Sequence, residues 1–174
     1  MNMWQVDFHE LYRRHLCRHS AWGLNFYHFV AVLGVYTSLF GLALQSAFQP
    51  IGQGFVAAVL AAYFMTLACN VPAKVFMVTL LVVFAVLAAV LFVPGFLGRR
   101  DILPAWGHLL LLVTWHRCQV FQHRFYPDTA DMSAFEARYK KGFALFVLLA
   151  VYELPLLLNF LVYDHEQPAE IRRG

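Results

Sequence analysis

A long hydrophobic run ends with the sequence Trp-His-Arg-Cys-Gln-Val-Phe-Gln-His, residues 115–123, in which polar side chains interrupt the apolar ones. In a helix that turns 100° per residue, His116 and His123 lie about 20° apart and two turns from each other, with Gln119 between them on the same side. Lipid offers no hydrogen-bond partners to such side chains. The stripe is therefore expected to face other helices, either as a metal or cofactor site or as a hydrogen-bonded packing seam.

The composition around this stretch is that of an integral membrane protein. Of the 174 residues, 61% are hydrophobic and 13% are charged, and the mean hydropathy is +0.60. These values are too apolar for a soluble domain of this length. No linker, internal repeat or low-complexity tract divides residues 1–174, so we expect a single all-α domain, a polytopic bundle of membrane helices. The net charge of +3 gives no support for nucleic-acid binding.

About five membrane-spanning helices are predicted, over residues 24–44, 52–70, 75–96, 102–123 and 142–162. An amphipathic helix over residues 4–19 precedes them and is expected to lie on the membrane surface, like a lid over the polar side chains. One face of this helix carries Trp4, Phe8, Leu11, Tyr12, His15 and His19. Tyr12 is therefore expected to be shielded from water, and Arg13 to be exposed.

The basic residues indicate the orientation. With five spans, eight Lys and Arg residues lie on the side of the N-terminus and only four on the other side. Because cytoplasmic loops carry the excess of positive charge, the N-terminus is predicted to be cytoplasmic. The membrane would be a bacterial inner membrane or the endoplasmic reticulum.

Histidines gather at one predicted depth. A rise of 1.5 Å per residue puts His28 roughly 6 Å and His116 roughly 9 Å inside the inner boundary of the membrane. His15, His19 and His123 fall at that boundary, whereas His108 lies about 12 Å further toward the opposite face. Several neutral imidazoles with at most one carboxylate suit iron, zinc or copper. The alternative is structural, with the histidines bonded to backbone carbonyls, Asn25 and Gln119.

The last predicted span contains a carboxylate, which like the histidines costs free energy to bury in a membrane. Glu153 is expected near the middle of the membrane, where ionisable residues are usually functional. It could orient a ligating histidine or transfer a proton. Pairing with Arg117, or protonation, would make it structural instead. The three cysteines show no paired spacing, so neither a zinc ribbon nor a disulfide framework is indicated.

Three short motifs resemble a known family. His19-x8-His28 leads into the first span, Gln119-x3-His123 ends a later span, and Glu153 lies in the last span. Over about residues 12–40 and 112–160 this pattern is similar to the 2-hydroxy fatty acid dioxygenase family of fatty-acid α-oxidation. The resemblance implies an Fe(II) enzyme that uses O2 to shorten a 2-hydroxy fatty acid by one carbon. It also implies that His19, His28 and His123 are iron ligands, with Gln119 and Glu153 as their neighbours.

On this hypothesis His116 or His15 completes the metal shell, and Arg117 or Arg124 pairs with the substrate carboxylate at headgroup level. The acyl chain would extend into the bundle. Two other classes remain open. A bis-imidazole haem protein could pair His28 with His116 or His123, and a membrane scaffold or lipid binder would hold no metal.

Overall fold

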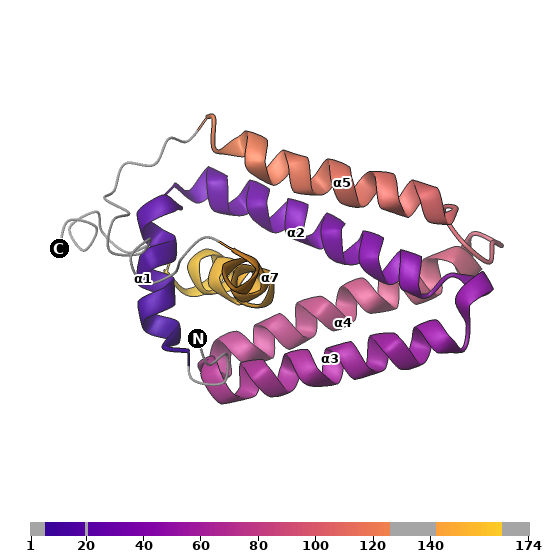
Figure 1. Cartoon of the computed structure of the whole chain (residues 1–174), viewed down its shortest axis with the longest axis horizontal. Coiled ribbons are helices and arrows are strands. Elements are labelled where there is room, and N and C mark those ends of the chain that lie inside the picture. The colour runs from indigo at the N-terminus through magenta and orange to yellow at the C-terminus, as the bar shows by residue number, and fades with distance from the viewer. Residues whose placement is uncertain (1–5, 20, 126–141, 165–174) are drawn as a thin grey trace.

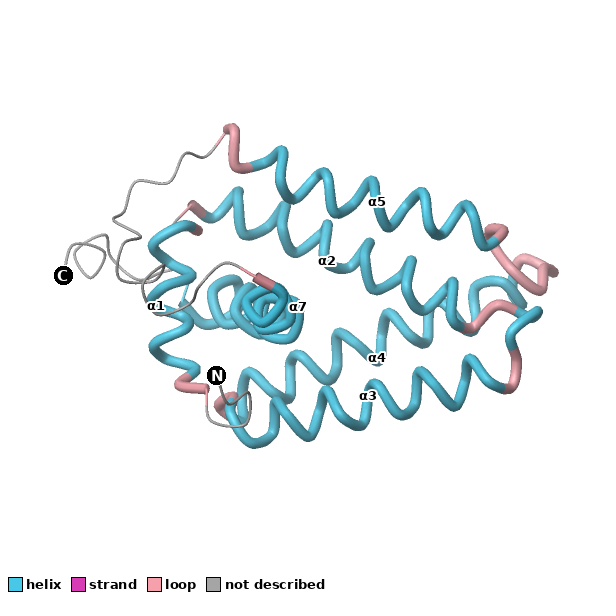
Figure 2. Tube along the Cα trace, in the orientation of Figure 1, coloured by secondary structure: helices cyan, strands magenta, loops and turns pink. Residues whose placement is uncertain are grey.

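The computed structural model describes residues 6–19, 21–125 and 142–164, and this part of the chain is helical without strands (Figure 1). The helices are α1 (Phe8–Arg18), α2 (Trp22–Ala43), α3 (Ile51–Asn70), α4 (Ala73–Phe96), α5 (Ala105–Gln122) and α7 (Phe143–Leu158). A 3-10 turn, Ser46–Phe48, follows α2, and a π-helical segment, Asn159–Asp164, continues α7. Figure 2 shows that short loops join α2, α3, α4 and α5 in turn. The all-α prediction is confirmed.

Four helices are long and apolar enough to cross a membrane: Trp22–Ala43, Ile51–Asn70, Ala73–Phe96 and Phe146–Asp164. Large apolar side chains such as Phe55, Leu81 and Phe92 are exposed on them, as lipid-facing side chains are. The protein is therefore an integral membrane protein. The predicted fourth span corresponds to α5, which is not among these four helices. The polar residues near its end lower its apolarity, and it runs beside α2 (Figure 1).

The last helix is arranged differently from a simple series of spans. In Figure 1 α2, α3, α4 and α5 run along the view, whereas α7 is seen nearly end-on and so crosses them. Its residues Leu148, Tyr152, Leu154, Leu156 and Leu157 are at most 1% exposed. They pack against α1, α2, α3 and α4 in two apolar clusters. Burial on several sides at once holds α7 in this crosswise position.

The N-terminal helix closes one end of the bundle. Asp7 caps α1 by accepting a hydrogen bond from the backbone N–H of Glu10. The apolar face of α1, with Phe8, Leu11 and Tyr12, packs on α7 and on the turn between α3 and α4. Tyr12 is buried and Arg13 is exposed, as the helical pattern predicted. The apolar face thus covers protein at this end of the bundle.

Two glycines set the register of α5 against α2. A Cβ atom at Gly34 would overlap the indole ring of Trp115, and one at Gly41 would overlap the imidazole of His108. Small residues allow such close helix contacts in membranes. Going from Gly41 to Gly34 moves seven residues back along α2, and going from His108 to Trp115 moves seven residues forward along the antiparallel α5. One further step of seven reaches positions 27 and 122, next to His28 and His123.

Hydrogen bonds fasten the start of α5 at the opposite end of the bundle. The Gln45 side chain donates to the carbonyl of Leu103 at 2.7 Å. The backbone N–H and hydroxyl of Ser46 donate to the two carboxylate oxygens of Asp101, at 3.0 and 2.6 Å. The helix is therefore held at its beginning by these contacts and along its length by the two glycines.

Candidate metal centre

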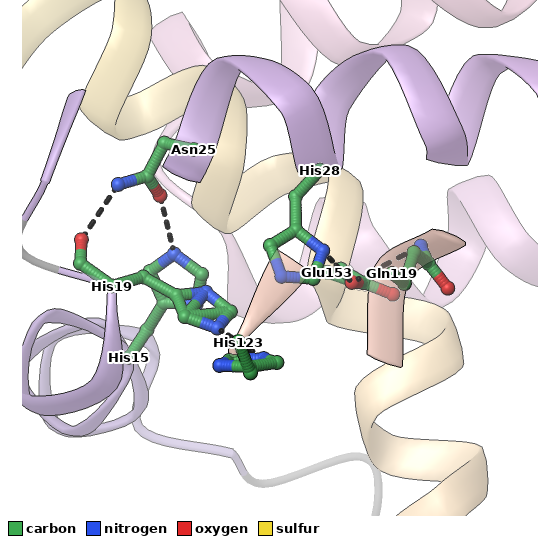
Figure 3. Close-up of polar contacts among 7 residues, drawn as sticks. All are labelled: His15, His19, Asn25, His28, Gln119, His123 and Glu153. Carbon is green, nitrogen blue, oxygen red and sulfur yellow. Dashed lines mark hydrogen bonds and ion pairs between the residues drawn. The ribbon is translucent and has the colours of Figure 1, made fainter. Parts of the chain in front are cut away.

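Three histidines meet where α1, α2 and α5 come together. His19 is the C-cap residue of α1, His28 lies in the second turn of α2, and His123 is the C-cap residue of α5. Each offers one ring nitrogen such that the three nitrogens lie within 4.8 Å of one another. His19 and His28 are buried and His123 is partly buried. The sequence placed these residues at one depth, and Figure 3 shows the rings facing one another.

The spacing of the three rings fits one metal ion. At a metal–nitrogen distance of about 2.1 Å, neighbouring ligand nitrogens are roughly 3.0–3.4 Å apart. The Nε2 atoms of His19 and His123 are 3.3 Å apart, already within that range. The His28 ring lies 4.6 and 5.0 Å, between centroids, from the His19 and His123 rings. The ligand nitrogen of His28 lies within 4.8 Å of those of the other two histidines.

Glu153 approaches this group from the crosswise helix. Its Oε1 lies 3.9 Å from Nδ1 of His28 and accepts a hydrogen bond from the Gln119 amide at 3.4 Å. Counting along a straight span had put Glu153 deeper than the histidines. That depth was wrong, because α7 crosses the other helices and carries Glu153 to the level of His28 (Figure 3). Such a carboxylate beside an imidazole orients the ring and raises its basicity.

His15 lies next to the three histidines but outside the group that shares one ion. Its Nε2 is 2.9 Å from Oδ1 of Asn25. Its ring meets the ring of His19 edge-on at 4.3 Å. Nothing in the helical pattern of residues 4–19 indicates this contact, because Asn25 belongs to the next helix. The structural alternative drawn from the sequence did include a bond from the histidines to Asn25, a polar residue in the first turn of an apolar span, and the structure shows it for His15.

His116 is not brought to the centre. Its side chain is exposed, and it does not belong to the group formed by His19, His28 and His123. His116 lies on nearly the same side of α5 as His123 but two turns, roughly 10 Å, before it along the axis. His19 of α1 meets His123 at the end of α5. The stripe predicted from residues 115–123 is therefore only partly used: Gln119 bonds to Glu153, His123 lies at the centre, and His116 is exposed.

The two candidate arginines are exposed on α5 and at its end. Arg117 and Arg124 are exposed and line a groove of about 400 Å³ along α5. The rest of its described lining is mostly apolar and consists of Val113, Thr114, Cys118, Val120 and Phe121. Arg124 lies over the Phe121 ring, 5.4 Å from its centroid. Both guanidinium groups thus belong to this groove on the exposed surface of α5.

No protein-family model, curated protein sequence or solved structure matches this chain. The function is therefore inferred from the geometry of the centre together with the sequence motifs.

Proposed function

We propose that this protein is a membrane-embedded oxygenase that holds one Fe(II) ion with His19, His28 and His123. We further propose that it acts on a 2-hydroxy fatty acid and shortens it by one carbon with O2. One observation supports the metal site: ligand nitrogens from three separate helices lie within 4.8 Å. The substrate class comes from the resemblance of the His19, His28, Gln119, His123 and Glu153 pattern to the 2-hydroxy fatty acid dioxygenase family.

Bound at this site, the ion would supply open coordination positions for an acid head group and for O2. The residues of the chain have separate tasks. His28 presents Nδ1 to Glu153, so Nε2 is the nitrogen it would offer to the ion. Glu153 would hold the His28 ring in place or accept a proton. Gln119 donates to Oε1 of Glu153 and so fixes the direction of that carboxylate.

The position of the centre suits an amphiphilic substrate. The centre lies at the end of the bundle that α1 covers (Figures 1 and 3). A fatty acid can keep its acid group at headgroup level there, with its chain in hydrocarbon. In this proposal Arg117 and Arg124 attract the carboxylate to the groove along α5, at the surface of the bundle.

Charge distribution supports the cytoplasmic side for this end. Among the described residues, Arg13, Arg14, Lys74 and Arg124 belong to the elements that meet at this end, while Arg99 and Arg100 lie in the loop at the other end (Figure 1). The excess of positive charge is typical of a cytoplasmic boundary. We therefore place the N-terminus and the centre on the cytoplasmic side of a bacterial inner membrane or of the endoplasmic reticulum.

The spacing of the rings favours a single ion over haem. The centroids of the three imidazoles are 4.6, 4.9 and 5.0 Å apart. Two axial histidines must stand on opposite faces of a porphyrin, and rings this close leave no room for one between them. An iron-containing preparation without a Soret band is expected.

The test uses the full-length protein, purified in detergent under reducing conditions without chelator. Elemental analysis should find about one iron per chain. O2 uptake should then require both iron and a long-chain 2-hydroxy acid, and mass spectrometry should find a product one carbon shorter. The unsubstituted fatty acid of the same length is the control substrate. Stoichiometric zinc with no O2 uptake would contradict the oxygenase assignment while keeping the metal site, and no bound metal would contradict both.

A further inference from the structure

The side chain of Asn25 joins the end of α1 to the start of α2. It is completely buried. Its Nδ2 group donates one hydrogen bond to the carbonyl of His19 at 2.6 Å and another to the carbonyl of Ala21 at 2.9 Å. Carbonyl oxygens accept only, so both amide protons are used and the orientation of the amide follows from its partners.

This orientation determines how His15 is bonded. With Nδ2 on the two carbonyls, Oδ1 of Asn25 faces Nε2 of His15 at 2.9 Å (Figure 3). An amide oxygen carries no proton, so Nε2 of His15 must be the donor. A nitrogen that carries a proton has no lone pair for a metal. The Nε2 atom of His15 is therefore engaged with Asn25 and cannot be a ligand atom in this arrangement. Its Nδ1 atom keeps a lone pair, but His15 does not belong to the group of described residues whose ligand atoms lie close enough to share one ion.

We infer that Asn25 is a positioning residue of the metal centre, and that His15 supports His19 instead of binding the ion. This inference rests on the proposed metal site of His19, His28 and His123. Asn25 bonds to the backbone of one proposed ligand, His19, and lies one helical turn before another, His28. It thereby sets the separation of two ligands on different helices.

A second path leads from Asn25 to the ring of His19. His15 lies one turn before His19 in α1, and the two rings meet edge-on at 80° with their centroids 4.3 Å apart. The hydrogen bond from His15 to Asn25 fixes the His15 ring, and that ring limits the rotation of the His19 ring. Both the backbone and the imidazole of His19 are thus held by the same amide.

Few side chains can replace this amide. Asparagine supplies two donors and one acceptor at the required reach. Aspartate has the same shape and can still accept from His15, but its oxygens would oppose the carbonyls of His19 and Ala21. Loss of a residue that orients metal ligands typically weakens metal affinity by about 10- to 100-fold. The Asn25→Asp variant keeps the acceptor for His15 and loses the two donors to the backbone carbonyls. It therefore tests the two donor hydrogen bonds separately.

The experiment measures Co²⁺ affinity by chelator competition and the visible Co²⁺ spectrum, for the full chain in detergent. Asn25→Ala and Asn25→Asp are expected to bind Co²⁺ about 10- to 100-fold more weakly, with an altered spectrum. His15→Gln is expected to weaken Co²⁺ binding far less than His19→Ala does, because the glutamine amide can still donate to Oδ1 of Asn25 and only the ring contact with His19 is lost. Helix content and elution volume check that each variant is folded.

Each outcome decides one point. Parent affinity in both Asn25 variants would overturn the positioning role. A loss of Co²⁺ in His15→Gln as complete as in His19→Ala would make His15 a ligand and overturn its supporting role, and this arm decides even if the Asn25 variants do not fold. Parent affinity in His19→Ala would contradict the proposed metal site itself, which separates that failure from a failure of the Asn25 inference.

Discussion

His19 at the end of α1 lies with Nε2 3.3 Å from Nε2 of His123 at the end of α5, although 104 positions separate them in the chain. This contact shows that the end of α1 and the end of α5 meet. Burial of two imidazoles here is costly unless each nitrogen has a partner. A shared metal ion would bind one nitrogen of each ring at this point.

The first prediction compares buried and exposed histidines. Ala in place of His19, His28 or His123 should abolish retention of iron through purification, because each removes one of three converging nitrogens. His116→Ala should retain the metal, because that side chain is exposed outside the group. Elemental analysis of folded protein is the measurement. Full occupancy in the His19, His28 and His123 variants would rule out the site, and loss of metal in His116→Ala would restore that residue to it.

Glu153→Gln is predicted to affect turnover more than metal content. Glutamine keeps the shape of the side chain and can still accept from Gln119, but it removes the charge beside Nδ1 of His28. Activity with a 2-hydroxy acid should fall by about 10- to 100-fold while iron is retained. Initial rates of O2 uptake and the iron content of the same sample measure the two effects. An unchanged rate would mean that the carboxylate is structural.

Gly34→Ala is predicted to destabilise the protein. A methyl group there would overlap the Trp115 indole, and relieving such overpacking typically costs about 1–3 kcal/mol. Gly54→Ala is the matched control in another long helix, since nothing lies within 4 Å of its added Cβ. That change should be neutral or stabilising by up to about 1 kcal/mol. Thermal unfolding followed by circular dichroism compares them, and equal melting temperatures would show that α5 does not pack on α2 at this glycine.

The docking of α1 can be tested at two neighbouring residues. In a background without the native cysteines, Arg13→Cys should react quickly with a water-soluble maleimide added to the protein in detergent. Tyr12→Cys should react slowly, because that side chain is only 6% exposed and packs on α7. Labelling rates are read by a mass shift on a gel. Similar rates at both positions would show that α1 does not cover this end of the bundle.

Asp101 should contribute a small acid dependence to stability. Hydrogen bonds from the hydroxyl and backbone N–H of Ser46 lower the pKa of Asp101 below its ordinary value of 3.8. Because the folded-state pKa is the lower one, the stabilisation is complete above about pH 4–5 and is lost as the pH falls through the folded-state pKa. Ser46→Ala should therefore lower the melting temperature at pH 6 and have less effect near pH 3. A deficit of the same size at both pH values would contradict this contribution.

The class of the protein and most helices follow from local properties of the chain. Apolar runs of spanning length predict α2, α3 and α4 without any tertiary information, because the membrane requires each span to satisfy its own backbone hydrogen bonds. The inward face of α1, with Tyr12 buried and Arg13 exposed, also follows from helical periodicity. The common depth of His19, His28 and His123 followed from counting residues at a fixed rise.

Only the tertiary structure decided which polar groups meet. Helical periodicity put His116 and His123 on one side of α5. It could not show that the centre forms at the end of that helix, where His19 of α1 meets His123, and leaves His116 exposed two turns away. The place of Glu153 depends on the direction of α7. Since α7 is apolar on nearly all sides, its sequence is equally consistent with running along the other helices or across them. Its direction is set by the surfaces of α1, α2, α3 and α4 that it buries, and these surfaces exist only once the chain has folded.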